Sequence, residues 1–230
     1  MKIKVIIPAT GTGTRYGGKI PKQFLKIEGK EIIAHTIEKF HSIISIDEII
    51  ISSKKEYFDR IKKIIKRNNF FKVKKLTEGG KLRQDSVYSG LSDLKCSDED
   101  LIIIHDAVRP FIGKKKITEL IKTALKENCV ILGLQVNETI KKVNSKNIIE
   151  KTVSREGLWS IQTPQIFRYG ILKKSFEKAM NDKFVGTDES AIVEYSGYKV
   201  KVIEGERDNI KITVKADIEV KRQRSNVKLS

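Results

Sequence analysis

The N-terminal segment combines glycine residues with fixed positive charge. An apolar run at residues 5–7 precedes the sequence P-A-T-G-T-G-T-R, which ends at Arg15. Because glycine has no Cβ atom, Gly11 and Gly13 allow backbone N–H groups to approach a phosphate closely. Arg15 and Lys22 add two positive charges near the same loop. The segment therefore predicts a site that holds a polyphosphate and stabilises charge while a phosphoryl group moves.

Two common phosphate-binding motifs do not fit this loop. The dinucleotide pattern G-x-G-x-x-G requires glycine at the position of Tyr16, and the next glycine comes one residue late. The P-loop pattern requires Ser or Thr after its G-K pair, where this chain has Ile20. An ordinary strand followed by a glycine-rich turn is the alternative interpretation. Arg15 and the P-K-Q sequence at 21–23 favour the phosphate site.

A candidate metal ligand follows a second apolar run. The sequence H-D-A-V-R-P begins at His105, directly after the wholly apolar residues 101–104. Asp106 is suited to hold Mg²⁺ against phosphate oxygens, and Arg109 is suited to bind a second phosphate or a hydroxyl group. A helix cap or a surface ion pair is the alternative interpretation of Asp106. For His105, a packed side chain is favoured over a catalytic base.

Further polar groups lie before a helix or beside apolar runs. The sequence G-G-K-L-R-Q-D-S at 79–86 offers glycines, an arginine and a hydroxyl group to an anion or to the edge of a base. Burial of the polar groups of Q-T-P-Q at 162–165 and N-I-K-I-T at 209–213 costs free energy unless they are paired. Alternation predicts that Lys211 shares a strand face with Asn209 and Thr213. The set, without a Ser-His-Asp or Cys-His arrangement, indicates phosphoryl or nucleotidyl transfer without a covalent intermediate.

The elements that must position these groups alternate between strand and helix. The expected strands are 5–7, 48–52, 73–77, 101–104, 130–136, 161–167 and 199–203. The expected helices are 31–40, 57–65, 87–94, 117–125, 169–180 and a terminal helix after residue 205. Such repeated βα units predict a parallel sheet with helices on both faces. Ligands bind at the carboxyl ends of such strands, where Gly11, Gly80 and Asp106 fall.

One segment interrupts this alternation. Residues 137–154 alternate loosely in hydropathy around the N-S pair at 144–145, which predicts an inserted β-hairpin arm. A hairpin that leaves an α/β chain must bury its apolar face against something. A second subunit is the simplest candidate, and we therefore expect a homodimer formed through this arm.

Composition bounds the remaining possibilities. A chain of 230 residues is long enough to bury a sizeable core, and we expect a single domain spanning 1–230 that includes the arm. No apolar run approaches the ~20 residues of a membrane span, and no signal-peptide pattern precedes the first strand, so we expect a cytoplasmic protein without membrane contact. Cys96 and Cys129 lack metal-ligand spacing and are interpreted as buried or incidental thiols.

The net charge of +17 permits two classes of function. One is an enzyme for phosphorylated substrates, and the other is a basic module that binds nucleic acid. The nucleic-acid module predicts basic residues gathered on one face together with exposed aromatic side chains. Because the lysines are spread along the whole chain, a solvated surface is favoured, and no nucleic-acid partner is expected.

Blocks of sequence that occur in a fixed order support the enzyme. They are P-A-T-G-T-G-T-R with P-K-Q-F, G-G-K-L-R-Q-D-S-V, H-D-A-V-R-P-F, N-E-T-I-K-K-V, R-E-G-L-W-S-I-Q-T-P-Q-I-F, T-D-E-S and N-I-K-I-T. In these blocks the chain resembles the 2-C-methyl-D-erythritol 4-phosphate cytidylyltransferases over nearly its whole length. The related ribitol-5-phosphate cytidylyltransferases share the glycine loop, the H-D-x-x-R-P-F segment, Q-T-P-Q and N-I-K-I-T.

The resemblance implies an activity and a fold. A sugar-alcohol phosphate attacks the α-phosphorus of CTP and displaces pyrophosphate in the presence of Mg²⁺, in the non-mevalonate pathway to isoprenoid precursors. The implied fold is α/β, with a mostly parallel, Rossmann-like nucleotidyltransferase sheet flanked by helices and an inserted β-hairpin dimerisation arm. A phosphate monoester has a second pKa near ~6, so the nucleophile is largely dianionic at neutral pH and requires positioning more than deprotonation.

The resemblance also implies residue roles. The implied catalytic residues are Arg15, Lys22, Arg155 and Lys211. Those implied to bind CTP are Ala9, Thr10, Gly11, Gly13, Arg15, Lys22, Gly80, Arg83, Ser86, Asp106 and Ala107. Those implied to bind the phosphosugar are Asp106, Arg109, Thr139, Arg155, Thr163, Thr187 and Lys211. Asp106 is the implied Mg²⁺ ligand, and Thr139 and Arg155 enter the site from the other subunit.

The choice between the two sugars depends on few residues. The L-W pair at 158–159 and T-I-K-K-V on the arm are more similar to the methylerythritol enzymes, which are therefore favoured over the ribitol enzymes.

Thr10 departs from the family, which usually has Ala or Gly at that position, and adds a hydroxyl group beside the triphosphate. We expect this departure to have a minor effect.

Overall fold

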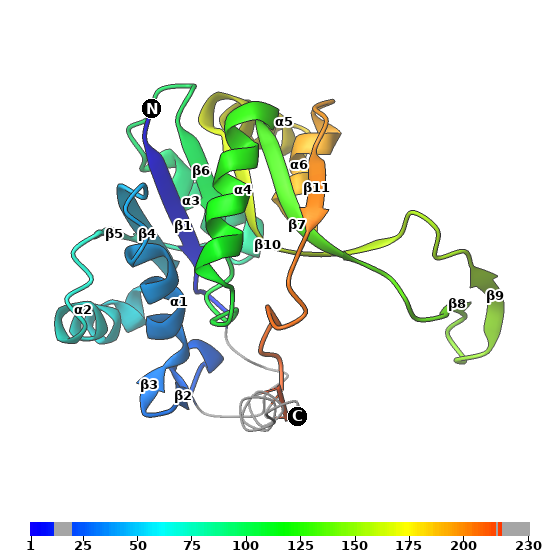
Figure 1. Cartoon of the computed structure of the whole chain (residues 1–230), viewed down its shortest axis with the longest axis horizontal. Helices are drawn as coiled ribbons and strands as arrows, with labels where there is room; N and C mark the ends of the chain where they lie inside the picture. The colour runs from blue at the N-terminus through cyan, green and yellow to red at the C-terminus, as the bar shows by residue number, and fades with distance from the viewer. Residues whose placement is uncertain (12–19, 215, 218–230) are drawn as a thin grey trace.

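A seven-stranded sheet forms the centre of the protein (Figure 1). The computed structural model describes residues 1–11, 20–214 and 216–217. In spatial order the strands are β11 (Lys201–Glu204), β7 (Cys129–Gln135), β10 (Trp159–Arg168), β6 (Leu101–Ile104), β1 (Ile3–Pro8), β4 (Glu48–Ser53) and β5 (Val73–Glu78). The expected strands therefore all belong to one sheet.

The sheet is mostly parallel, as expected. β1 runs parallel to both β4 and β6, and β4–β5 and β11–β7 are also parallel pairs. β10 is antiparallel to both of its neighbours, β6 and β7. The chain leaves β7, forms the arm and returns directly as β10, and a hairpin-like return of this kind reverses the direction of the strand.

Helices cover both faces of the sheet. The helices are α1 (Ile32–His41), α2 (Phe58–Arg67), α3 (Arg83–Ser92), α4 (Lys114–Glu127), α5 (Tyr169–Asn181) and α6 (Glu189–Tyr195). Side chains of α1, α2 and α4 share one core cluster, and those of α3, α5 and α6 share the other. Burial on both faces explains why the central strands are continuous apolar runs rather than alternating ones.

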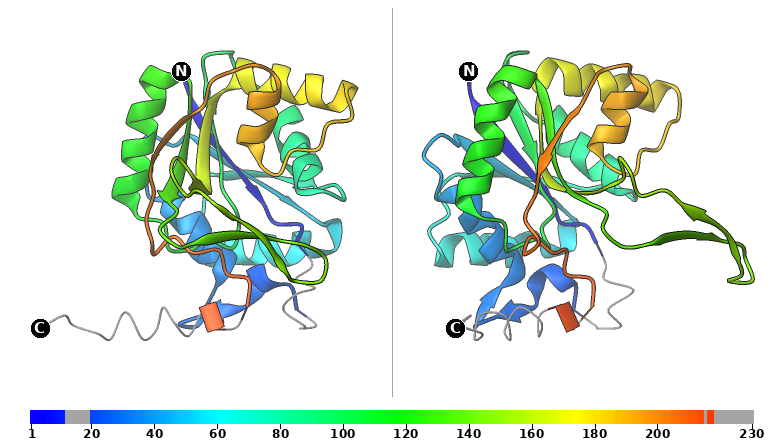
Figure 2. Two further views of the ribbon diagram at one scale, coloured as in Figure 1. Left: turned by 90° about the vertical axis from the view of Figure 1, so that its right-hand side faces the viewer. Right: turned by 45° about the vertical axis from the view of Figure 1, so that its right-hand side comes forward.

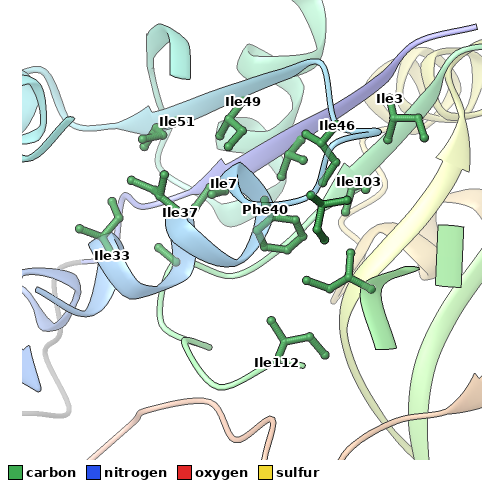
Figure 3. Packing of buried hydrophobic residues seen from close by; sticks show 14 of the residues in the cluster. Ile3, Ile7, Ile33, Ile37, Phe40, Ile46, Ile49, Ile51, Ile103 and Ile112 are labelled. Atoms are coloured by element: carbon green, nitrogen blue, oxygen red, sulfur yellow. The ribbon is translucent and has the colours of Figure 1, made fainter. Parts of the chain in front are cut away.

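Isoleucine dominates the core beneath α1. Figure 3 shows Ile33, Ile37 and Phe40 of this helix beside Ile7 and Ile49 of the sheet. All five side chains are fully buried. Successive strand residues point to opposite faces, so Ile7 joins this cluster, while Ile6 belongs to the cluster on the other face and packs against α3. The end of β1 is thereby fixed on both faces of the sheet.

The predicted arm is present as an antiparallel hairpin. Its strands are β8 (Ile140–Val143) and β9 (Ile149–Val153), and they pair from Ile140 opposite Val153. The Asn144 side chain accepts hydrogen bonds from the backbone N–H groups of Lys146 and Ile148 and closes the turn. Figure 2 shows the hairpin extending away from the sheet and its helices.

Some local elements differ from the expectations. The alternation at 209–213 does not form a strand, so the prediction that Lys211 and Asn209 share a strand face was wrong. A small hairpin of β2 (Lys26–Ile27) and β3 (Lys30–Glu31), two 3-10 turns, η2 (Lys22–Phe24) and η3 (Lys55–Tyr57), and helix α6 were not predicted. Most of the expected terminal helix lies outside the described residues. Within the described part of the chain, no helix has the length and apolar character needed to cross a membrane.

Candidate active site

The carboxyl ends of four parallel strands open onto one cleft of about 430 Å³. The cleft lies where β1, β4, β5 and β6 end, which is the usual ligand-binding edge of such a sheet. Its lining residues are Pro8, Ala9, Thr10, Gly11, Lys22, Gln23, Lys54, Gly80, Lys81, Arg83, Asp106, Ala107, Val108 and Lys211. Most of the residues implied to bind CTP are therefore brought together.

A second cleft, of about 270 Å³, adjoins the first. It is lined by Arg83, Asp106, Arg109, Ile161, Gln162, Thr163, Gln165, Thr187, Asp188 and Lys211. These include all the residues of the main body that were implied to bind the phosphosugar. Arg83, Asp106 and Lys211 line both clefts. The two clefts thus meet at one cluster of charged side chains.

Asp106 is the centre of this cluster. Its Oδ1 lies 2.9 Å from Arg83 Nε, and its Oδ2 lies 3.0 Å from Lys211 Nζ and 3.4 Å from Arg109 Nε. The side chain is 6% exposed. Burial by itself would raise the pKa of Asp106, but the charges of Arg83, Lys211 and Arg109 outweigh burial and hold that pKa far below its usual range. The carboxylate is therefore ionised at neutral pH.

His105 is a packed, neutral side chain, as expected. It is fully buried, and its ring lies 4.9 Å from that of Phe40 between centroids. Thr163 Oγ1 accepts a hydrogen bond from the backbone N–H of Asp106, donates to His105 Nδ1, and so leaves His105 Nε2 to donate to the backbone oxygen of Arg109. Burial lowers the pKa of His105 to about 4. The Thr163 hydroxyl group is thus used within the protein, and its predicted substrate contact stays a prediction.

Lys211 lies on an irregular segment that other side chains hold in place. The buried Asn209 side chain donates to Gln162 Oε1 at 3.1 Å and to the backbone oxygen of Thr163 at 2.8 Å. Arg109 Nη1 donates to the backbone oxygen of Asn209 at 2.8 Å. On the other side of Lys211, the backbone N–H of Ile212 donates to Val108. These contacts place the Lys211 ammonium group beside Asp106, although the segment that carries Lys211 is not a β-strand.

The glycines after β5 permit a close approach of α3 to the β1 loop. A Cβ atom at Gly79 would lie 2.1 Å from Thr10 Cγ2, and one at Gly80 would lie 2.2 Å from Asp85 Cβ. Thr10 Oγ1 and Ser86 Oγ lie 2.9 Å apart, and Ser86 is fully buried. The Thr10 hydroxyl group that departs from the family therefore contacts α3, and the predicted contact of Ser86 with the nucleotide stays a prediction.

Lys22 approaches the same cleft from η2. The neighbouring Gln23 side chain is buried and donates to the backbone oxygen of Ala9 at 2.8 Å, which ties the turn to the end of β1. Pro21 directly precedes this turn, and its extended backbone (φ −58°, ψ 141°) begins it. The position of Lys22 at the cleft therefore follows from the P-K-Q sequence.

Other expected site residues lie elsewhere. Thr139 and Arg155 belong to the exposed base of the arm and line neither cleft, while Arg155 bonds to the backbone oxygen of Asn137. Gly13 and Arg15 lie outside the described residues. The structure therefore places Thr139 and Arg155 away from both clefts, and it tests the implied role of none of these four residues.

Several residues at the site were not predicted. Lys54 and Lys81 line the first cleft, and Glu189 of α6 is fully buried and bonds to Arg83 Nη1 at 2.5 Å. Lys54 follows directly after β4, so its place at a strand end was a usable signal. Glu189 belongs to the T-D-E-S block, but nothing in its local sequence indicates that its partner is Arg83.

The parallel-rich sheet and the two cation-lined clefts define an α/β enzyme that transfers a phosphorylated group. The family model described as "IspD: 2-C-methyl-D-erythritol 4-phosphate cytidylyltransferase" matches residues 3–222, and the chain belongs to this family. The expected family, the nucleotidyltransferase class and the fold are thereby confirmed.

Individual relatives agree with this membership. The chain is 43% identical to the 2-C-methyl-D-erythritol 4-phosphate cytidylyltransferase of Clostridioides difficile, over 97% of this chain and 93% of that protein. It is 41% identical to the protein of that name from Alkaliphilus metalliredigens, over 94% and 90% of the two chains. The crystal structure of 4-diphosphocytidyl-2C-methyl-D-erythritol synthase from Anaerococcus prevotii matches with a TM-score of 0.83 at 29% identity, over 98% of this chain and 99% of that one.

Proposed function

We propose that the protein transfers a cytidylyl group from CTP to 2-C-methyl-D-erythritol 4-phosphate and releases pyrophosphate, as a step toward isoprenoid precursors in the cytoplasm. Family membership supports this reaction. The observation that carries it is the meeting of two clefts at Arg83, Asp106 and Lys211. A transfer between two phosphorylated molecules requires two adjoining sites that share positive charge.

The reaction is a displacement at the α-phosphorus. An oxygen of the sugar phosphate forms a bond to this phosphorus, and the bond to the oxygen that bridges to the β-phosphate breaks. Pyrophosphate leaves with that electron pair. The attacking phosphate is largely dianionic at neutral pH and requires no base, which agrees with the neutral, buried state of His105.

The cations of the chain offset the repulsion between the two substrates. Lys22 lines the first cleft, where it would stabilise charge that grows on the α-phosphoryl oxygens. Arg109 and Lys211 line the second cleft, where they would bind the phosphate of the sugar. Thr187 lies in the same cleft and offers a hydroxyl group. Arg15 would join Lys22 at the triphosphate.

The donor chemistry of the site fits Mg²⁺. Asp106 is the carboxylate that lines both clefts, and proteins commonly hold Mg²⁺ through one or two carboxylates together with substrate phosphates. In the described part of the chain no cluster of three or more His, Cys, Asp or Glu residues is suited to a metal. Asp106 would therefore hold the ion jointly with the nucleotide. When bound, Mg²⁺ would supply charge that neutralises the phosphates.

A transfer assay tests the proposed function. The purified protein is incubated with CTP and Mg²⁺, and with either 2-C-methyl-D-erythritol 4-phosphate or ribitol 5-phosphate, and both products are quantified. We expect equal amounts of pyrophosphate and the cytidylylated methylerythritol, and slower turnover of ribitol 5-phosphate. A preference for ribitol 5-phosphate would contradict the proposed substrate. Tight binding of RNA or DNA without any CTP turnover would support the basic nucleic-acid module instead.

A substitution at Asn209 tests how Lys211 is held. Asn209→Ala removes two donated hydrogen bonds and should lower kcat/KM for the phosphosugar about tenfold or more, because displacement of Lys211 weakens that cleft. Steady-state kinetics measures kcat/KM, and thermal unfolding measures the stability of the variant. Arg207→Ala, an exposed change on the same segment, is the control and should alter neither quantity. Wild-type kinetics in Asn209→Ala would show that these bonds do not position Lys211.

The arm is proposed to complete the site of a second subunit in a homodimer. Val143, Ile148 and Ile149 on the hairpin are 46%, 60% and 59% exposed in the single chain. Burial of such side chains between subunits is favourable. Arg155 and Thr139 lie at the base of the same arm, so docking of the arm on a second copy would carry them toward its clefts.

Mixing two inactive variants tests this arrangement. If Arg155 acts in the site of the partner, heterodimers of Arg155→Ala and Lys22→Ala chains contain one site with both side chains intact. Unfolding and refolding the mixture should then recover about a quarter of wild-type activity, because half of the dimers are mixed and each has one good site. Each variant refolded alone is the control. Recovery of no activity, together with confirmed heterodimers, would contradict a role in trans.

A further inference from the structure

Glu189 occupies a buried position beside the charge cluster. It lies in the first turn of α6 and is fully buried. Its Oε1 accepts a hydrogen bond from Arg83 Nη1 at 2.5 Å, and Arg83 Nε in turn bonds to Asp106 Oδ1 at 2.9 Å. One guanidinium group therefore connects two carboxylates that lie on different elements. Asp106 faces both clefts, whereas Glu189 faces neither.

The N-terminus of α6 holds Glu189 in place. Asp188 caps the helix by accepting from the backbone N–H of Ala191 at 2.9 Å. Gln165 on β10 donates to Asp188 Oδ2 at 2.8 Å and accepts from the backbone N–H of Ser190 at 3.1 Å. These bonds fix the first turn of α6 to the central sheet. The residues directly before and after Glu189, Asp188 and Ser190, are thus both held by hydrogen bonds, which fixes the position of Glu189.

The geometry limits how Arg83 pairs with Asp106. Arginine and carboxylate groups frequently pair through two parallel N–H···O bonds. Here Glu189 engages Nη1, while Nη2, which lies beside Nε in the guanidinium fork, has no hydrogen-bond partner within the described part of the chain. Arg83 therefore contacts Asp106 through Nε alone. Asp106 Oδ2 is therefore left to Lys211 at 3.0 Å and Arg109 at 3.4 Å. A bidentate pair between Arg83 and Asp106 would compete for that oxygen.

The contacts of Arg83 and Glu189 leave some of their buried polar atoms without a hydrogen-bond partner. Arg83 Nη2 and Glu189 Oε2 are buried and have no hydrogen-bond partner within the described part of the chain. Unpaired buried polar atoms cost free energy, and such costs are concentrated at functional sites. Burial raises the pKa of Glu189 while the Arg83 charge opposes that rise. Burial alone would lower the pKa of Arg83, but the two carboxylates outweigh it and keep the guanidinium group charged.

We propose that Glu189 is a positioning residue for the transfer reaction: it turns the Arg83 guanidinium group so that Asp106 Oδ2 stays available to Lys211 and Arg109. The inference rests on the proposed function. Without the Glu189 charge, Arg83 turns toward Asp106 and pairs with both of its oxygens. Lys211 then loses its anchor beside the second cleft, and the phosphosugar binds more weakly there.

The test is a double-mutant cycle with kinetic readouts. Glu189→Gln keeps the size of the side chain and removes its charge. We expect the KM for the phosphosugar to rise at least tenfold, while the KM for CTP changes by less than threefold. In an Arg83→Met background, Glu189→Gln should add less than a twofold further change, because the residue acts through Arg83. Glu194→Gln, an exposed change on the same helix, is the matched control and should leave both KM values unaltered.

The outcomes separate this inference from the proposed function. A Glu189→Gln enzyme with phosphosugar KM within twofold of wild type would overturn the inference, and so would an equal fold-change in the Arg83→Met background. Absence of transfer by the wild-type protein would instead contradict the proposed function. If Glu189→Gln does not fold, Arg83→Lys tests the same point, because lysine keeps the charge but lacks the fork that contacts both carboxylates. Because lysine cannot pair with both oxygens of Asp106, the phosphosugar KM of Arg83→Lys should stay within threefold of wild type, and a tenfold rise would overturn the inference.

Discussion

Lys22→Ala is expected to lower kcat by several orders of magnitude while the fold stays intact. Lys22 lines the cleft at the carboxyl ends of the strands, on a turn that Gln23 ties to the end of β1. Removal of one preorganised donor to a developing negative charge costs about 10²–10³-fold in kcat, and a full cation at the reacting phosphorus has a larger effect. Single-turnover kinetics with saturating CTP measures the loss directly.

A matched change separates catalysis from structure. Lys26→Ala removes an exposed lysine from the neighbouring β2 and should leave kcat unchanged. Both variants should unfold at the wild-type temperature. Lys22→Ala with more than about a tenth of the wild-type kcat would rule out Lys22 as a principal stabiliser, because a tenfold loss corresponds to only ~1.4 kcal/mol.

Asp106→Asn is expected to cost both activity and stability. The substitution leaves the guanidinium groups of Arg83 and Arg109 and the Lys211 ammonium group without the carboxylate that lies 2.9 to 3.4 Å from them. Removal of one partner from a buried pair costs about 3–5 kcal/mol, and partial exposure of Arg83 and Lys211 places the expected loss near the lower end of that range. Urea unfolding gives the change in free energy, and kcat/KM should fall at least about 10²-fold.

An exposed ion pair provides the control for this variant. Asp93 Oδ2 lies 2.9 Å from Lys75 Nζ, and the two side chains are 40% and 47% exposed. Asp93→Asn should cost less than about 1 kcal/mol, because surface pairs are screened by solvent. Equal losses of stability in the two variants would show that burial of Asp106 among the three cations does not make its charge important.

The sheet and the first cleft could be predicted because local sequence encodes them. The run at 101–104 is apolar throughout since both faces of β6 are covered by helices. The glycines at 79 and 80 precede a helix and permit close packing against Thr10 and Asp85, respectively. Strand ends then identify the position of Asp106 without further information.

The direction of β10 and the conformation around Lys211 could not be predicted in the same way. The residue pattern of a strand is the same in parallel and antiparallel pairs when both of its faces are buried. The alternation N-I-K-I-T is typical of a strand, but side-chain bonds from Asn209 and Arg109 hold this segment instead. Tertiary contacts thus override the local pattern.

The ion-pair network around Arg83 and Asp106 could not be predicted from the sequence for a different reason. Arg83 and Glu189 are 106 residues apart in the chain, and each is a common surface residue type by itself. The sequence interpretation of Asp106 weighed a metal site against a cap or a surface ion pair, and the structure shows a buried network of three cations around it. A metal role remains compatible with this network as a proposal.

A crystal structure with CTP, Mg²⁺ and 2-C-methyl-D-erythritol 4-phosphate bound to the Lys22→Ala protein tests the central claim most directly. The account predicts that the nucleotide occupies the first cleft and the sugar phosphate the second, where it contacts Arg109 and Lys211. The α-phosphorus should then lie at the junction beside Asp106. A nucleotide bound away from this junction, or a sugar phosphate bound outside the second cleft, would contradict it.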